Sequence, residues 1–134
     1  MQALKQLVKH RGGCHCGAVA FEVEAAEAVV VQHCNCSMCD KAGFTHLIVP
    51  KSAFILLRGE DNLTTYTFNS HIAKHKFCKT CGIESFYIPR SNPDGFSINF
   101  KCLDASTFTS VTHEDFDGQN WEDNAASLSH LSQE

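Results

Sequence analysis

The sequence predicts a mainly β domain whose antiparallel sheets are held together by cysteine-bound metal. Short segments of alternating or β-branched residues, separated by turn residues, indicate strands. The connections between these segments are too short for parallel crossovers, so antiparallel pairing is expected. Pairs of cysteines fall in tight turns beside the strands, where a metal ion could pin distant strands together. The 134 residues are enough for one domain with one core.

The first elements are predicted from alternation and branching along the chain. Residues 1–10 carry a few apolar side chains, spaced as in a short packing helix or an extended arm. Residues 17–24 alternate between apolar and polar positions, which predicts a strand with one buried face. The β-branched run over residues 28–33 suits a more buried strand. Further strands are expected at residues 45–49, 54–57, 63–68, 72–77, 83–88 and 96–101.

Turn residues mark the ends of these strands. The segments 59–62, 69–70 and 92–95 contain the Gly, Asn, Asp and Ser residues that tolerate tight or left-handed turns. Pro50 and Pro89 lie at strand ends, where a missing amide donor does little harm. The strand boundaries therefore agree with the local turn chemistry.

The C-terminal region differs from the rest of the chain. Residues after Asp104 are polar and acidic, and 119–131 is the only later segment expected to form a short helix. The predicted organisation is an N-terminal arm over residues 1–11, a zinc-binding domain over 12–125 and a flexible tail over 126–134. No internal repeat or second domain is expected.

Composition argues against two classes of partner. The formal net charge is -4 at pH 7 with no dense cluster of Lys and Arg, so nucleic acid is not an expected partner. No apolar run approaches the roughly 20 residues of a membrane span. Residues 1–10 also lack the apolar centre of a signal peptide. Neither nucleic acid nor a membrane is therefore an expected partner.

The 8 cysteines are the most informative residues of the chain. Without an export signal they favour metal ligation over disulfides, because a reducing compartment keeps thiols reduced. The alternative, a secreted disulfide scaffold, would need bonds between cysteines two or three residues apart, and such bonds are strained. We therefore expect zinc, and a protein of the cytoplasm or the nucleus.

Two cysteine pairs could complete one closed zinc site. Cys14 and Cys16 form one knuckle, and Cys78 and Cys81 form another far along the chain. Gly82 permits the turn that the second knuckle needs. In a small β-rich domain, such a site can supply much of the free energy of folding.

Cys34, Cys36 and Cys39 form a different kind of set. Three thiolates on one short segment can hold an ion but leave its fourth coordination position to another ligand. In an alternative interpretation, Cys102 joins the other seven cysteines in two ordinary structural sites, or packs as a small buried hydrophobe. The candidates for the fourth position are water, an added thiol, His33, His46 and Cys102.

Several further motifs follow one another in a specific order. They are GGCHCGAV at 12–19, CNCSMC at 34–39, TTYTFN at 64–69, FCKTCG at 77–82, PRSNP at 89–93, CLD at 102–104 and FDGQNWE at 116–122. Together they resemble the glutathione-dependent formaldehyde-activating enzyme family, called the Gfa family, and in particular its centromere protein V-like members. The resemblance covers most of the chain.

The resemblance implies a fold and an activity. The family fold is a β-tent, in which zinc joins two antiparallel sheets. On this pattern two zinc ions are expected, a structural one and a catalytic one. The implied reaction is the reversible addition of glutathione to formaldehyde or a related small aldehyde, which is the reaction of a carbon-sulfur lyase. The structural ligands would be Cys14, Cys16, Cys78 and Cys81, and the catalytic ones Cys34, Cys36 and Cys39.

Glutathione would also need partners for its carboxylates and ammonium group. Lys41, Arg90 and Lys101 are the cationic candidates, and Asn99 and Asp104 are candidates for the polar groups. Two classes of function are open. The first is an enzyme of thiol and aldehyde chemistry, and the second is a non-catalytic, zinc-stabilised module that binds glutathione or another protein.

Overall fold

The computed structural model describes residues 7–67, 72–89, 92, 94–117 and 131. Within them, strands dominate and the helices are short. The strands are β1 (Leu7–Gly13), β2 (Ala20–Ala26), β3 (Ala28–Cys34), β4 (Thr45–Pro50), β5 (Phe54–Arg58), β6 (Leu63–Tyr66), β7 (Lys74–Cys78), β8 (Phe86–Ile88), β9 (Gly95–Asn99) and β10 (Ser110–Phe116). The helices are α1 (Ser37–Ala42) and the 3-10 turns η1 (Lys51–Ala53), η2 (Glu60–Asn62), η3 (Phe100–Cys102) and η4 (Ala105–Thr107).

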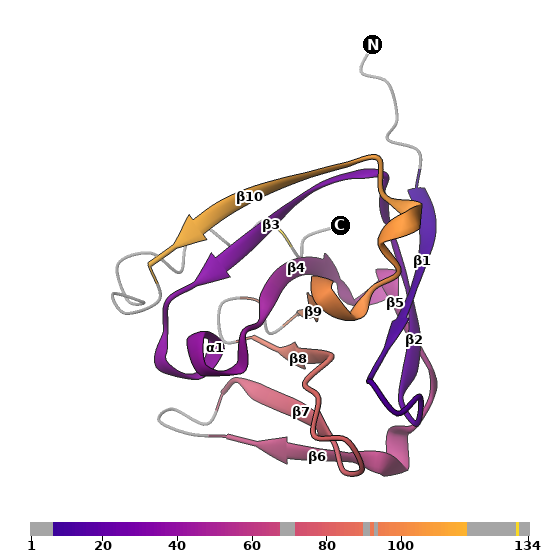
Figure 1. Ribbon diagram of the computed structural model, residues 1–134, viewed down its shortest axis with the longest axis vertical. Coiled ribbons are helices and arrows are strands. Elements are labelled where there is room, and N and C mark those ends of the chain that lie inside the picture. Colours follow the sequence, from indigo (N-terminus) through magenta and orange to yellow (C-terminus); the bar gives the residue numbers. More distant parts are fainter. Residues whose placement is uncertain (1–6, 68–71, 90–91, 93, 118–130, 132–134) are drawn as a thin grey trace.

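The strands form two sheets. One has three strands in the order β1-β2-β5, and the other has seven in the order β10-β3-β4-β9-β8-β7-β6. Figure 1 shows the small sheet along one side and the large sheet spread across the other. The prediction of a mainly β fold with two sheets is therefore confirmed.

One strand pair departs from the antiparallel prediction. β3 and β10 pair in parallel, whereas the other described pairs are antiparallel. Most of the domain lies between these two strands in the sequence, so their connection is long enough for a parallel crossover. The antiparallel prediction was wrong here because it considered only connections between consecutive strands.

The hydrophobic core lies between the two sheets. Phe21 of β2 in the small sheet meets Phe86 of β8 in the large sheet, with 5.8 Å between their ring centroids. In the large sheet, Phe86 lies opposite Ile98, and Ile98 lies opposite Leu47, so these side chains share the core face. The residues that alternate with them in the same strands point to the other face.

The predicted strands all overlap observed ones, but β10, α1 and the four 3-10 turns were not predicted, and β1 was covered only by the extended-arm alternative. β1, β10 and α1 have no clear periodicity, since β1 and β10 expose charged or polar side chains at several positions and α1 has only 6 residues. The extended alternative for the N-terminal region holds for β1. The predicted helix over 119–131 lies outside the described residues, apart from Leu131.

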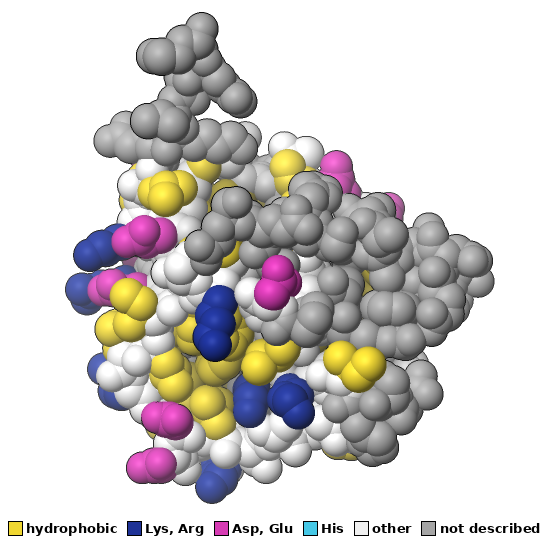
Figure 2. Space-filling view, turned by 180° about the vertical axis from the view of Figure 1, so that it is seen from behind, with side chains coloured by type: hydrophobic (Ala, Val, Ile, Leu, Met, Phe, Trp, Pro, Cys, Tyr) yellow, Lys and Arg dark blue, Asp and Glu magenta, His cyan; other side chains and the backbone are white. Residues whose placement is uncertain are grey.

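Figure 2 shows how side-chain types are distributed over the described residues on one face of the molecule. Basic, acidic and hydrophobic side chains are interspersed there. Among the most exposed hydrophobic residues are Leu7, Ile55 and Leu57, which belong to strands of the small sheet. Within the described part of the chain, no helix has the length and apolar character needed to cross a bilayer.

Candidate metal centres

A four-cysteine cluster joins the two sheets. Cys14 and Cys16 lie in the connection from β1 to β2 in the small sheet, whereas Cys78 ends β7 in the large sheet and Cys81 lies in the turn after it. The four sulfur atoms lie within 4.8 Å of one another. This cluster therefore brings together cysteines that are far apart in the sequence.

The sulfur spacing of this cluster fits a tetrahedral ion. Cys16 Sγ lies 3.6 Å from both Cys14 Sγ and Cys78 Sγ. A zinc ion with Zn–S bonds of about 2.3 Å has tetrahedral S–S edges of about 3.8 Å. The spacing is far too long for a disulfide bond, and all 8 cysteines are free in the structure. These residues could hold zinc.

Backbone amides and one side chain point at the sulfurs. Val19 N donates to Cys14 Sγ at 3.3 Å, and Thr80 N donates to Cys78 Sγ at 3.4 Å. The amides of Cys81 and Thr80 lower the pKa of the Cys78 thiol to about 6, so it favours the thiolate that a metal requires. Gly82 adopts φ 75°, and its amide donates to Cys78 O at 2.9 Å. Its left-handed conformation closes the knuckle, as predicted.

Asn62 was not predicted as part of this site. It lies at the end of η2, and its Nδ2 donates to Cys78 Sγ at 3.3 Å and to Thr80 Oγ1 at 3.1 Å. A second contact ties the same loops together, since Lys79 N donates to Asn62 O at 2.8 Å. Asn62 therefore orients a sulfur ligand from outside the coordination sphere. An isolated asparagine in a turn gave no sequence signal for this role.

The three-cysteine cluster lies on one continuous segment. Cys34 ends β3, Cys36 caps the N-terminus of α1, and Cys39 is buried within α1. Their sulfur atoms lie within 4.8 Å of one another, and Cys39 N donates to Cys36 Sγ at 3.4 Å. Gly43 ends the helix in the left-handed conformation. The N-terminal cap and this glycine hold three sulfurs of a six-residue segment around one point.

No other described side chain completes this cluster. Within the described residues, no ligand atom of a further His, Cys, Asp or Glu lies within 4.8 Å of all three sulfurs. His33 Nε2 instead lies 2.7 Å from His113 Nδ1, and His46 Nδ1 lies 2.9 Å from Ser97 Oγ. The three-cysteine cluster therefore leaves one position of a tetrahedral ion to a ligand from elsewhere.

Cys102 belongs to neither cluster. Burial raises the pKa of its thiol to about 11, and charge on Cys14 and Cys81 contributes to the rise. Cys102 lies beside β1 near the four-cysteine cluster, since a β-carbon at Gly12 would lie 2.6 Å from Cys102 O and Gly12 pairs with Leu103. The interpretation in which it closes a second structural site with the three-cysteine cluster does not fit this placement.

Buried polar side chains lie beside the three-cysteine cluster. Tyr87 Oη lies 4.0 Å from Cys39 Sγ and 3.4 Å from His46 Nδ1. Burial lowers the pKa of His46 to about 4, so its imidazole is neutral at physiological pH. His75 and Glu84 form a buried pair with 2.8 Å between Nδ1 and Oε2, and burial raises the pKa of the Glu84 carboxyl. His46 was a candidate for the fourth ligand, whereas Tyr87, His75 and Glu84 were not predicted as site residues.

The residues predicted to contact glutathione differ in their position and exposure. Lys41 is exposed and lies in the last turn of α1. Lys101 Nζ lies close to Gly43, which ends this helix, since a β-carbon built on Gly43 would be 3.8 Å from it. Both lysines therefore lie near the C-terminal end of α1. Asn99 is 7% exposed, and it accepts from Thr45 N and Lys101 N and donates to Glu84 O. Its side chain therefore already has internal partners. Arg90 lies outside the described residues.

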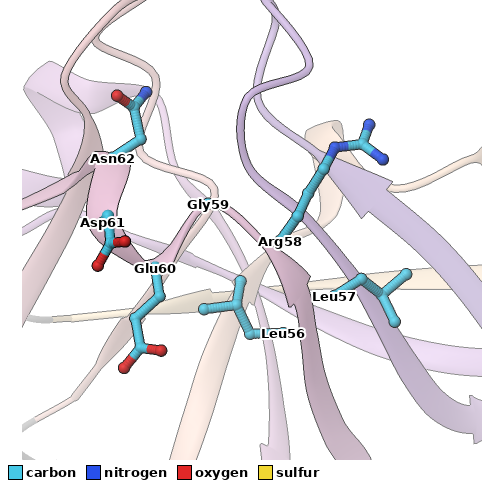
Figure 3. Close-up of a pocket in the computed structure, with 7 residues that line it drawn as sticks. All are labelled: Leu56, Leu57, Arg58, Gly59, Glu60, Asp61 and Asn62. Carbon is cyan, nitrogen blue, oxygen red and sulfur yellow. The ribbon is translucent and has the colours of Figure 1, made fainter.

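A surface pocket of about 410 Å³ lies apart from this region (Figure 3). It is formed by the end of β5 and by η2, and the side chains around it do not converge on one point. Asn62, at its edge, reaches the four-cysteine cluster. The pocket lining contains no cysteine or histidine, so it does not resemble either cluster chemically. The residues that line it are Leu56, Leu57, Arg58, Gly59, Glu60, Asp61 and Asn62.

Fold and site together define a class of protein: a small, mainly β protein with one cysteine cluster that joins its two sheets and a second, incomplete one that could also hold zinc. A family model described as glutathione-dependent formaldehyde-activating enzyme matches residues 9–119, and the chain belongs to this family. It is also similar to a crystal structure of a Rhodobacter sphaeroides protein, with 37% sequence identity and a TM-score of 0.66. That similarity covers 78% of this chain and 99% of the other.

Proposed function

We propose that the protein is a zinc-dependent carbon-sulfur lyase that adds glutathione reversibly to formaldehyde or a related small aldehyde. The observation that carries this proposal is the three-cysteine cluster, to which no described residue adds a fourth ligand. The four-cysteine cluster takes the structural role, because it joins the two sheets. The proposal thus assigns two zinc ions, with Cys34, Cys36 and Cys39 as the catalytic set.

The reaction needs glutathione as a thiolate, with its sulfur oriented towards the aldehyde carbon. Zinc bound by the three cysteines would stabilise the glutathione sulfur as a thiolate at neutral pH. The thiolate lone pair forms a bond to the aldehyde carbon, the carbonyl π pair moves to oxygen, and this oxygen takes a proton from water. The product is S-hydroxymethylglutathione when the aldehyde is formaldehyde.

The side chains of this protein would bind and orient the tripeptide. Lys41 and Lys101 lie near the C-terminal end of α1, the helix that contains Cys39, and we assign them to the glutathione carboxylates. Asn99 accepts a hydrogen bond from Lys101 N and so holds the turn that carries this lysine. We retain Arg90 as a further cationic contact and Asn99 as a supporting polar one.

The test is a glutathione titration of cobalt-substituted protein. An added thiolate should strengthen the sulfur-to-metal charge-transfer absorption, whereas S-methylglutathione, which has no thiol, should not. Cys36→Ser should abolish the response. Cys102→Ser is the matched control, because Cys102 belongs to neither cluster, and it should keep the response. An unchanged spectrum with glutathione, at two metal ions per chain, would refute thiol entry.

Catalysis is tested separately from binding. Glutathione adds to formaldehyde spontaneously, so the rate with enzyme must exceed a background measured under the same conditions. Thiol binding without any excess rate would assign the chain to a non-catalytic glutathione-binding or protein-interaction module, a role that its centromere protein V-like motifs would suit. The free cysteines also favour a reducing compartment, the cytoplasm or the nucleus.

A further inference from the structure

A row of buried polar side chains crosses the large sheet on the face away from the hydrophobic core. Strand register places Tyr87 of β8 between His75 of β7 and Ser97 of β9, and His46 of β4 adds to the row through its contact with Ser97 Oγ. All four residues are less than a tenth exposed. Cys39 lies against the row, with its sulfur 4.0 Å from Tyr87 Oη. The row thus borders the three-cysteine cluster.

The ring of Tyr87 is held in a fixed orientation. It stacks on His75 with 4.5 Å between ring centroids and an interplanar angle of 11°. Phe44 packs edge-on against it at 5.1 Å. His75 is itself held by Glu84 at 2.8 Å. These contacts fix where the Tyr87 hydroxyl points without using the hydroxyl itself.

The hydroxyl of Tyr87 makes only long contacts within the described structure. They measure 3.4 Å to His46 Nδ1 and 4.0 Å to Cys39 Sγ, whereas hydroxyl hydrogen bonds are ordinarily about 2.7–2.8 Å long. A buried tyrosine hydroxyl normally finds a close partner. The neighbouring His46 Nε2 is also buried and has no partner among the described residues. The Tyr87 hydroxyl and His46 Nε2, both next to the three-cysteine cluster, therefore lack a close hydrogen-bond partner among the described residues.

We propose that the Tyr87 hydroxyl is a catalytic residue that donates a hydrogen bond to the carbonyl oxygen of the aldehyde. This inference rests on the proposed function and adds to it the group that recognises the second substrate. As the carbon-sulfur bond forms, the π electrons of the carbonyl move to oxygen, and a fixed donor stabilises the charge that develops there. The oxygen then takes its proton from water. His46 acts as the positioning residue beside the hydroxyl.

The kinetic test compares the two tyrosines of the chain, Tyr66 and Tyr87. Tyr87→Phe should lower kcat/KM for formaldehyde by about a hundredfold, the loss typical of one oxyanion donor. Its glutathione dissociation constant, measured from cobalt absorption, should stay within about twofold of wild type, because the thiol site is unchanged. Tyr66→Phe is the matched control, since Tyr66 lies on β6 and is 50% exposed, and it should change neither quantity.

A spectroscopic test does not depend on turnover. Protein labelled with 3-fluorotyrosine should give two fluorine resonances, which the two phenylalanine variants assign. Formamide, an unreactive small carbonyl compound, added to the glutathione-loaded protein should shift the Tyr87 resonance and leave that of Tyr66 unchanged. A Tyr87→Phe variant with undiminished kcat/KM, or a Tyr87 resonance that formamide does not shift, would overturn the assignment while leaving the lyase proposal intact. A wild-type protein no faster than the spontaneous reaction would overturn both.

Discussion

Replacement of Cys81 by serine should destabilise the fold much more than replacement of Cys36. A zinc ion held by the four-cysteine cluster would cross-link the chain over long loops, since Cys16 and Cys78 are 62 residues apart. The three-cysteine cluster closes only the segment 34–39. With loop closure scaling as (3/2)RT ln n, the long loop contributes about 2 kcal/mol more constraint on the unfolded chain than the short one. This difference follows from sequence separation alone, so it is a lower bound on the difference in stability between the two variants.

The binding free energy of the metal would add to this difference in stability. Structural zinc in small domains contributes about 10 kcal/mol or more of apparent binding free energy, comparable to a total stability of about 5–15 kcal/mol. Loss of the four-cysteine metal should therefore unfold much of the domain. Loss of the other should leave the fold intact and lower the melting temperature little. For this chain length, the loop term alone corresponds to a difference on the order of 8 °C.

The assay combines thermal unfolding, followed by circular dichroism, with metal analysis of each purified variant. Cys36→Ser should keep one zinc ion per chain and a cooperative transition while losing glutathione binding. Cys81→Ser should show a broad or absent transition. Cys102→Ser controls for the chemical change from sulfur to oxygen outside both clusters. Equal loss of structure in Cys36→Ser and Cys81→Ser would refute the division between a structural and a catalytic site.

Two further predictions concern residues outside the metal ligands. Asn62→Ala removes the hydrogen bond to Cys78 Sγ and should weaken zinc binding at the four-cysteine cluster by about 10–100-fold in competition with a chelator, while Asn35→Ala, in the three-cysteine segment, should leave it unchanged. The pKa of His46 falls from 6.5 to about 4 on folding, so the unfolded chain takes up a proton first as the pH drops. Its contribution of about 3 kcal/mol should be fully present above pH 6.5 and lost progressively towards pH 4. Urea unfolding across this range should show a smaller pH-dependent loss in His46→Gln, and an identical slope in both proteins would contradict the assignment.

The sequence was sufficient for the strands β2 to β9 and for the grouping of the cysteines into pairs and a triplet. The strand signal is local, because alternation and turn residues lie within each segment, as in 28–33 and 45–49. Cysteine spacing is equally local, and Gly82 takes the left-handed conformation that its place in the knuckle requires. These features depend on residues within a few positions of one another.

The residues beside the cysteines could not be found in this way. Tyr87 and His46 are 41 positions apart, and β10 pairs with β3 across most of the chain. Their proximity is a result of strand order, which the sequence does not show locally. An aromatic residue within a predicted strand is ordinarily part of a core, so no signal distinguished Tyr87 from its neighbours. His46 was a candidate ligand because it lies close to the cysteine triplet in sequence, but its place beside Tyr87 was not predicted.

Strand alternation explains why the site lies where it does. In β8 and β9 the core-facing residues Phe86 and Ile98 are each followed or preceded by a polar one, Tyr87 and Ser97, which must point to the opposite face. The face of the large sheet opposite the core therefore carries polar groups that the central strands of the sheet hold rigidly. The segment with the three cysteines packs its buried member, Cys39, against this face. A shift of one residue in the register of β8 would bury Tyr87 in the core and move Phe86 beside Cys39, so sheet register itself brings the cysteine cluster and the hydroxyl together.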